Sequence, residues 1–155
     1  MKTIILIVSH LLVAALGFAA GIYALPILTA PDAPSSTEVA AMAATAQFTG
    51  EFRRDLEGSD ALHWGEGTLS VGPRFIALQG RIAPGPDYKL YLSPEFVQTE
   101  AEFETSRNRM VRVGDVRTFD NFVVAVPQDV DVAQFTTVVV WCESFGEFIT
   151  AARYR

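Results

Sequence analysis

A long uncharged segment at the N-terminus divides the chain. Residues Thr3 to Leu28 carry no charged side chain, Lys2 precedes them, and the first charge after them is Asp32. As a helix, residues 4–25 would extend about 33 Å, enough to cross a hydrocarbon core of about 30 Å. The charge asymmetry predicts a single-pass membrane protein with a cytoplasmic N-terminus. The remaining chain is then extracytoplasmic, which in a bacterium means periplasmic.

The same segment also has the general features of a cleaved secretory signal peptide. Such a peptide has an apolar region of about 7–15 residues and a small-x-small cleavage site. The run here is longer. Its candidate sites at Leu28-Thr29-Ala30 and Ile22-Tyr23-Ala24 are poor, because Pro31 follows the first and a large residue begins the second. We favour a signal anchor over residues 1–28 and keep the cleaved peptide as the alternative.

Gly17 and Gly21 form a Gly-x-x-x-Gly spacing inside this segment. Small residues at this spacing let two membrane helices approach closely and pair. They are also common in membrane helices that do not pair. The pattern therefore favours no more than a candidate helix-mediated dimer.

Residues 29–46 are rich in Ala, Pro, Ser and Thr, a composition typical of a linker. The part from Glu38 to Ala46 has high helix propensity. It forms either a short helix or an extension of the linker. A domain over residues 47–155 follows.

The pattern within residues 47–155 is that of short strands separated by turn signals. No long helical periodicity interrupts it. This spacing predicts an all-β fold, an antiparallel β-sandwich or barrel-like domain. We expect one helical turn within Asp129–Phe135, and an exposed helical or irregular excursion at Thr99–Arg109. The expected strands are Gln47–Arg53, Ala61–Trp64, Thr68–Val71, Arg74–Leu78, Tyr88–Leu92, Met110–Val113, Phe119–Val126, Val138–Trp141 and Phe148–Ala152.

The single cysteine of the chain, Cys142, follows four consecutive β-formers, Val138 to Trp141. A run of this kind indicates a buried strand, with the thiol at the strand end beside a turn. One cysteine cannot form an internal disulfide. Free cysteine is often only a packing residue, but successive strand residues point to opposite faces. If Trp141 is in the core, Cys142 points outward, which favours an accessible thiol.

Four blocks of the sequence resemble the DM13 family and occur in the family's order. They are Gln47–Phe52, Gly85–Ser93, Asn121–Pro127 with Asp131–Phe135, and Val139–Gly146. The resemblance covers residues 47–154. It implies a small β-domain with a redox or electron-transfer role. It also implies that Cys142 acts as a thiol or holds a prosthetic group such as haem.

Cys142 is therefore the redox or prosthetic-group candidate, and no residue is assigned a catalytic role. Trp141, Phe145 and Gly146 are its expected pocket neighbours. His63 is a weaker candidate, as an axial haem ligand or a metal ligand. One histidine with no second His or Cys nearby is far below the density of a zinc site. The cofactor is thus haem or none.

Several other functions find no support. No Cys-x-x-Cys-His is present, which excludes covalent c-type haem. Hydrolase elbows, zinc-protease motifs and phosphate-binding glycine loops are also missing. A net charge of -6 argues against nucleic acid as a partner. The alternative to a redox role is a non-catalytic binding or adhesion module, with a structural cysteine and with recognition by the loops around Thr99–Arg109.

Overall fold

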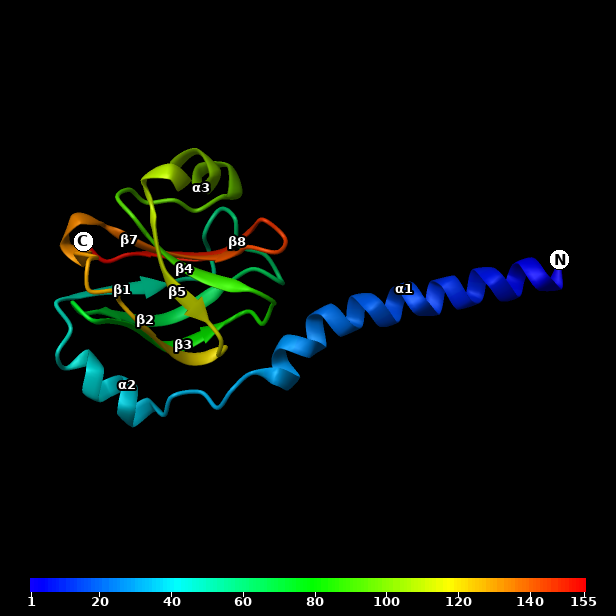
Figure 1. Ribbon diagram of the computed structural model, residues 1–155, viewed down its shortest axis with the longest axis horizontal. Coiled ribbons are helices and arrows are strands. Elements are labelled where there is room, and N and C mark those ends of the chain that lie inside the picture. The colour runs from blue at the N-terminus through cyan, green and yellow to red at the C-terminus, as the bar shows by residue number, and fades with distance from the viewer.

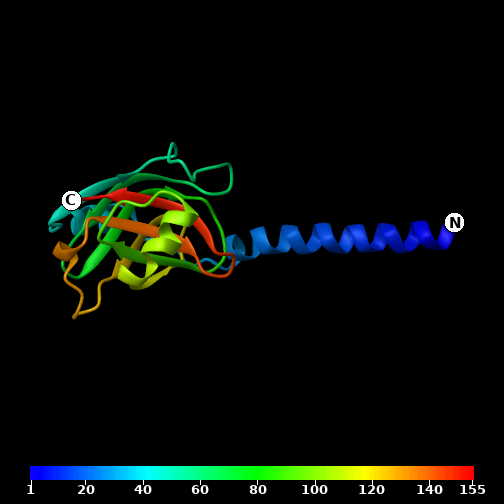
Figure 2. The ribbon, with the colours of Figure 1, turned by 90° about the horizontal axis from the view of Figure 1, so that it is seen from above.

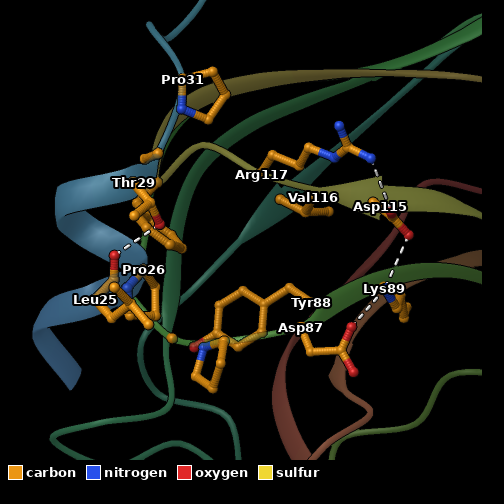
Figure 3. A pocket seen from close by; sticks show the side chains of 14 residues that line it. Leu25, Pro26, Thr29, Pro31, Asp87, Tyr88, Lys89, Asp115, Val116 and Arg117 are labelled. Atoms are coloured by element: carbon orange, nitrogen blue, oxygen red, sulfur yellow. Dashed lines mark hydrogen bonds and ion pairs between the residues drawn. The ribbon is translucent and has the colours of Figure 1, made fainter. Parts of the chain in front are cut away.

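The computed structural model describes all residues, 1–155, and consists of a projecting helix and a β-domain (Figures 1 and 2). Helix α1 (Lys2–Thr29) is 28 residues long and has no buried residue. By length and composition, it is the one helix that is able to cross a membrane. Its final turns, around Pro26, lie against the domain (Figure 3).

The domain is built from two antiparallel sheets of four strands each, which confirms the all-β prediction. Every strand pair within each sheet is antiparallel. In spatial order, the first sheet contains β1 (Phe48–Phe52), β2 (Gly65–Val71), β3 (Phe75–Ile82) and β6 (Asp120–Ala125). The second contains β5 (Val111–Val116), β4 (Tyr88–Ser93), β7 (Thr137–Cys142) and β8 (Glu147–Arg153).

The main core lies between the two sheets and follows the two-residue period of the strands. From β4 it receives Tyr88, Leu90 and Leu92, and from β7 it receives Val138, Val140 and Cys142. The first sheet contributes large apolar side chains of its own, among them Leu69, Ile76 and Phe122. Burial of this apolar surface stabilises a domain that has no disulfide.

A second, smaller core covers the outer face of β7. The segment expected as an excursion forms helix α3 (Glu100–Ser106) and the 3-10 turn η1 (Arg107–Arg109). It is helical, but it is not simply exposed, because Phe103 is fully buried and stacks on Trp141 with ring centroids 3.9 Å apart. Strand β7 is therefore buried on both faces, which explains its continuous apolar sequence.

The linker region contains a helix that packs on the first sheet. Helix α2 (Ser36–Ala43) begins at a capping box in which Ser35 and Glu38 satisfy each other's backbone N–H groups. Its Val39 is buried against Phe75 and Ala77. Of the two alternatives for this segment, the short helix is observed.

Three local predictions are wrong. Ala61–Trp64 is a loop, because the Asp60 carboxylate accepts the backbone N–H groups of Leu62 and His63 at 2.6 and 2.8 Å and holds a turn there. Strand β2 begins at Gly65, three residues before the expected start at Thr68. Strand β5 continues through Gly114 and Asp115 beyond the expected end at Val113, where a bulge interrupts its pairing with β4. The helical turn expected before β7 is present as η2 (Val132–Gln134).

Candidate functional site

Cys142 lies at the end of β7 nearest α1, where it pairs with Tyr88 of β4 and Glu147 of β8. The side chain points into the core between the sheets, and the residue is 2% exposed. Its Sγ donates a hydrogen bond to the carbonyl oxygen of Pro86, 3.2 Å away. The thiol is thus held by the turn that precedes β4.

That turn, Gly85-Pro86-Asp87, has a conformation that few sequences permit. A Cβ at Gly85 would lie 2.2 Å from the hydroxyl oxygen of Tyr88. Asp87 has a φ of 54°, in the left-handed region that Asp tolerates better than most residues. The turn is joined to the β7–β8 hairpin by two hydrogen bonds, from the Ser144 hydroxyl to the Asp87 carboxylate (2.9 Å) and from the Glu143 N–H to the Asp87 carbonyl (3.2 Å).

A pocket of about 320 Å³ opens beside the thiol. Cys142, His63 and Phe145 all line this pocket. Its walls also include three residues of α1, namely Ala19, Ile22 and Tyr23. The other lining residues are Leu62, Pro84, Gly85, Pro86, Tyr88, Glu147 and Ile149.

Two expected pocket neighbours lie elsewhere. Trp141 faces the outer core with Phe103, so it is on the opposite side of β7 from Cys142. Gly146 lies in the hairpin turn, with a φ of 68° that favours glycine, and does not line the pocket. The alternation argument placed Trp141 and Cys142 on opposite faces correctly. The conclusion that the thiol is accessible was wrong, because both faces of β7 are covered.

The surroundings of the thiol favour its protonated form. Burial raises the pKa of Cys142, and the carboxylates of Asp87 and Glu147 raise it further. The backbone N–H groups of Phe145 and Ser144 partly oppose this effect. A thiolate, which is the nucleophilic form, is therefore disfavoured in the resting structure.

His63 occupies the loop between β1 and β2 and also lines the pocket. Its Nδ1 lies 3.1 Å from a carboxylate oxygen of Asp60. A carboxylate at this nitrogen fixes the orientation of the ring. The loop thus brings an imidazole to the pocket that also contains the thiol.

A second opening of about 380 Å³ adjoins the first and shares Gly85, Pro86 and Tyr88 with it. Figure 3 shows its ion pairs between β4 and β5. Lys89 contacts Asp87 at 2.6 Å and Asp115 at 3.0 Å, and Arg117 contacts Asp115 at 3.3 Å. Lys89, with Arg112 at 2.8 Å and Arg117, lowers the pKa of Asp115 to about 2. The network fixes the turn that holds the thiol.

The geometry does not fit a haem ligated by Cys142. Iron binds the deprotonated sulfur, whereas this sulfur is protonated, hydrogen-bonded to Pro86 and almost fully covered. A pocket of about 320 Å³ is also at the small end of the roughly 300–1,000 Å³ range of ligand sites. No group of three or more His, Cys, Asp or Glu side chains is arranged to hold a metal ion.

Sequence reasoning missed Pro86 and Leu62 as parts of the site. The position of the Gly-Pro-Asp turn against Cys142 depends on the pairing of β4 with β7. The local sequence does not determine the order of the strands in a sheet. The contribution of Ile22 and Tyr23 depends on how α1 meets the domain, which no local pattern indicates.

Comparison with known proteins identifies one family. The family model described as electron transfer DM13 matches residues 47–154, which include both sheets and the whole of the Gly-Pro-Asp turn. No curated protein and no solved structure matches the chain.

Proposed function

Because this chain belongs to the DM13 family, we propose that it is a membrane-anchored electron-transfer accessory protein in which Cys142 acts as a redox thiol. The observation that carries the proposal is the pocket that contains the chain's only cysteine together with His63. In this account residues 4–25 of α1 form the anchor, the N-terminus is cytoplasmic and the domain is extracytoplasmic.

The proposed chemistry is thiol–disulfide exchange with an external disulfide. The Cys142 thiol gives its proton to His63, and the thiolate attacks one sulfur of the disulfide. A new S–S bond forms, the original S–S bond breaks, and the leaving thiolate takes up the proton. The Cys142 sulfur is thereby oxidised from the thiol to the disulfide level, the leaving sulfur is reduced to a thiol, and Cys142 ends in a mixed disulfide. Burial and the Pro86 hydrogen bond make the resting thiol slow to react, which protects it from non-specific oxidation.

The second candidate is a binding module in which Cys142 only packs. Its support is the 2% exposure of Cys142 and the raised pKa of the thiol. The contacts of the Thr99–Arg109 segment give little support to recognition by that segment. In that segment Phe103 is buried, and Arg107 pairs with Glu143 at 2.7 Å, so that much of the segment serves the outer core.

Dimerisation through two paired α1 helices is a separate proposal. Nothing lies within 4 Å of a Cβ built at Gly17 or Gly21, so this face of α1 is free to receive a second helix. The redox proposal does not depend on it.

The function is tested on the full-length chain in lipid nanodiscs. The wild type and Cys142→Ser are each incubated with a small disulfide, and adducts are identified by mass spectrometry. The proposal predicts a mixed disulfide on the native wild type and none on Cys142→Ser. Added haem should give no Soret band that depends on Cys142. A thiol that forms adducts only after denaturation would favour the binding module.

A further inference from the structure

The exposed apolar side chains of the domain are confined to one place. Beyond residue 29, only two large hydrophobic side chains are exposed, Leu62 at 56% and Phe145 at 54%. They come from different loops, one between β1 and β2 and one in the β7–β8 turn. Both line the pocket that contains Cys142. Single exposed apolar residues are ordinary, but two that converge on one rim form a surface that needs a partner.

The position of this rim relative to α1 identifies the partner. The same pocket is lined by Ala19, Ile22 and Tyr23, in the last turns of the apolar helix. If residues 4–25 cross the bilayer, these turns lie at the outer membrane–water boundary, where tyrosine is enriched. The rim formed by Leu62 and Phe145 is therefore at the level of that boundary. Figure 2 shows the β7–β8 turn, in orange-red, at the end of the domain that adjoins the last turns of α1.

The charges around the rim exclude an electrostatic attachment. Neither Lys nor Arg lines the pocket, and its one carboxylate is Glu147. The carboxylate of Asp60, which accepts the backbone N–H of Leu62, adds a second negative charge beside the rim. A basic surface would be needed to attract anionic lipid. Any contact with lipid is therefore made by apolar insertion and suits a zwitterionic membrane.

We propose that Leu62 and Phe145 insert into the membrane interface beside α1, so that the pocket of Cys142 opens toward lipid. This inference rests on the proposed membrane anchor. It adds to the proposed function that oxidants reach the thiol from the lipid phase. Disulfides and thiol reagents that partition into the interface gain access, and strongly charged ones do not.

The test uses the full-length chain in phosphatidylcholine nanodiscs, in a Cys142→Ser background. Serine keeps a donor for the Pro86 carbonyl. Leu62→Cys, Phe145→Cys and Asp129→Cys are each labelled with an environment-sensitive fluorophore. All three residues are exposed, and Asp129 is the control because it precedes the far end of β7. Quenching by a nitroxide lipid is compared with quenching by aqueous iodide.

We expect labels at positions 62 and 145 to be quenched several-fold more by the nitroxide lipid than the label at 129, and less by iodide. Equal iodide quenching at all three positions, in a protein whose mass shows that α1 is intact, would overturn the insertion of Leu62 and Phe145. It would not contradict the membrane anchor. Loss of residues 1–29 from the mature chain would overturn both.

A second measurement uses the wild-type thiol and needs no added cysteine. Two maleimides of the same reactivity, one neutral and one sulfonated, are compared in nanodiscs and in detergent. The neutral reagent should label Cys142 several-fold faster than the sulfonated one, and the ratio should fall in detergent. Equal rates in nanodiscs would contradict a pocket that opens toward lipid.

Discussion

Trp141 and Cys142 are adjacent in the sequence and belong to different cores. The indole of Trp141 stacks on Phe103 outside the second sheet, whereas the Cys142 thiol points between the sheets toward Pro86. One strand thus separates a structural aromatic cluster from the candidate redox pocket.

Phe103→Ala should destabilise the domain by about 3–5 kcal/mol, because it removes a fully buried aromatic side chain. Urea unfolding of the full-length chain in detergent measures this change. Phe145→Ala is the matched control. Its side chain is 54% exposed, so a change of no more than about 0.5 kcal/mol is expected. Equal effects of the two variants would contradict the assignment of Phe103 to the outer core.

Gly85→Ala should make the Cys142 thiol more accessible. The added methyl would lie 2.2 Å from the Tyr88 hydroxyl, so the turn or Tyr88 must move, and the Pro86 carbonyl moves with the turn. We expect faster native labelling of Cys142 as well as lower stability. Gly146→Ala serves for comparison, since it meets no atom within 4 Å but sits at a φ of 68°. It should cost about 1 kcal/mol and leave labelling nearly unchanged. Unchanged labelling in Gly85→Ala would count against the role of the turn.

The labelling rate of Cys142 should depend steeply on pH. Because the pKa of this thiol is raised, the thiolate fraction should still increase, about tenfold per pH unit, at pH values where ordinary thiols have levelled off. A stopped-flow thiol assay on the folded chain gives the profile, with unfolded chain as the reference. A profile that levels off at lower pH than the unfolded chain would show an activated thiolate instead.

His63→Gln should slow disulfide exchange at Cys142 and change its pH profile, because glutamine cannot take the thiol proton. His63→Ala distinguishes this from a packing effect, since added imidazole should restore part of the rate. Loss of stability without a change in the pH profile would reduce His63 to a structural residue of the loop.

The ion pairs of Asp115 predict a specific acid sensitivity. Its folded pKa of about 2 lies below the unfolded value of about 3.9. The stability that it contributes is present above pH 4 and is lost as the pH falls toward 2. Asp115→Asn should flatten the stability profile in this window. Asp129→Asn, at an exposed residue that makes no ion pair, should not. Identical profiles for the two variants would contradict the role of the Lys89 network.

The sequence was most informative where a local pattern is strong. The apolar run from Val138 to Trp141 correctly indicated a buried strand that ends at Cys142, and the spacing of the short strands correctly indicated an antiparallel β-domain. Prediction failed where distant segments meet. Phe103 buries Trp141, but it belongs to a highly charged segment that was expected to be exposed. Strand β2 was expected to begin at Thr68, but it begins at Gly65, where a Cβ would lie 2.6 Å from Thr150 on the other sheet.

Some residues of the candidate site were predictable from the local sequence and others were not. Cys142, Phe145 and the weaker candidate His63 were named from local features, and they share one pocket. Pro86 and Tyr88 join them through strand pairing, and Ile22 and Tyr23 through the packing of α1 on the domain. These relationships depend on strand order and on the docking of a helix, neither of which a single local pattern encodes.

The most direct test of the redox account is a redox titration of Cys142 in the full-length chain in nanodiscs. The folded protein is equilibrated with glutathione buffers of graded potential, and the fraction of Cys142 in mixed disulfide is measured by mass spectrometry. We predict a reversible transition in the folded state, and an approach to that equilibrium that is faster in Gly85→Ala and slower in His63→Gln. A thiol that stays free at every potential until the domain is unfolded would contradict the account and leave Cys142 as a packing residue.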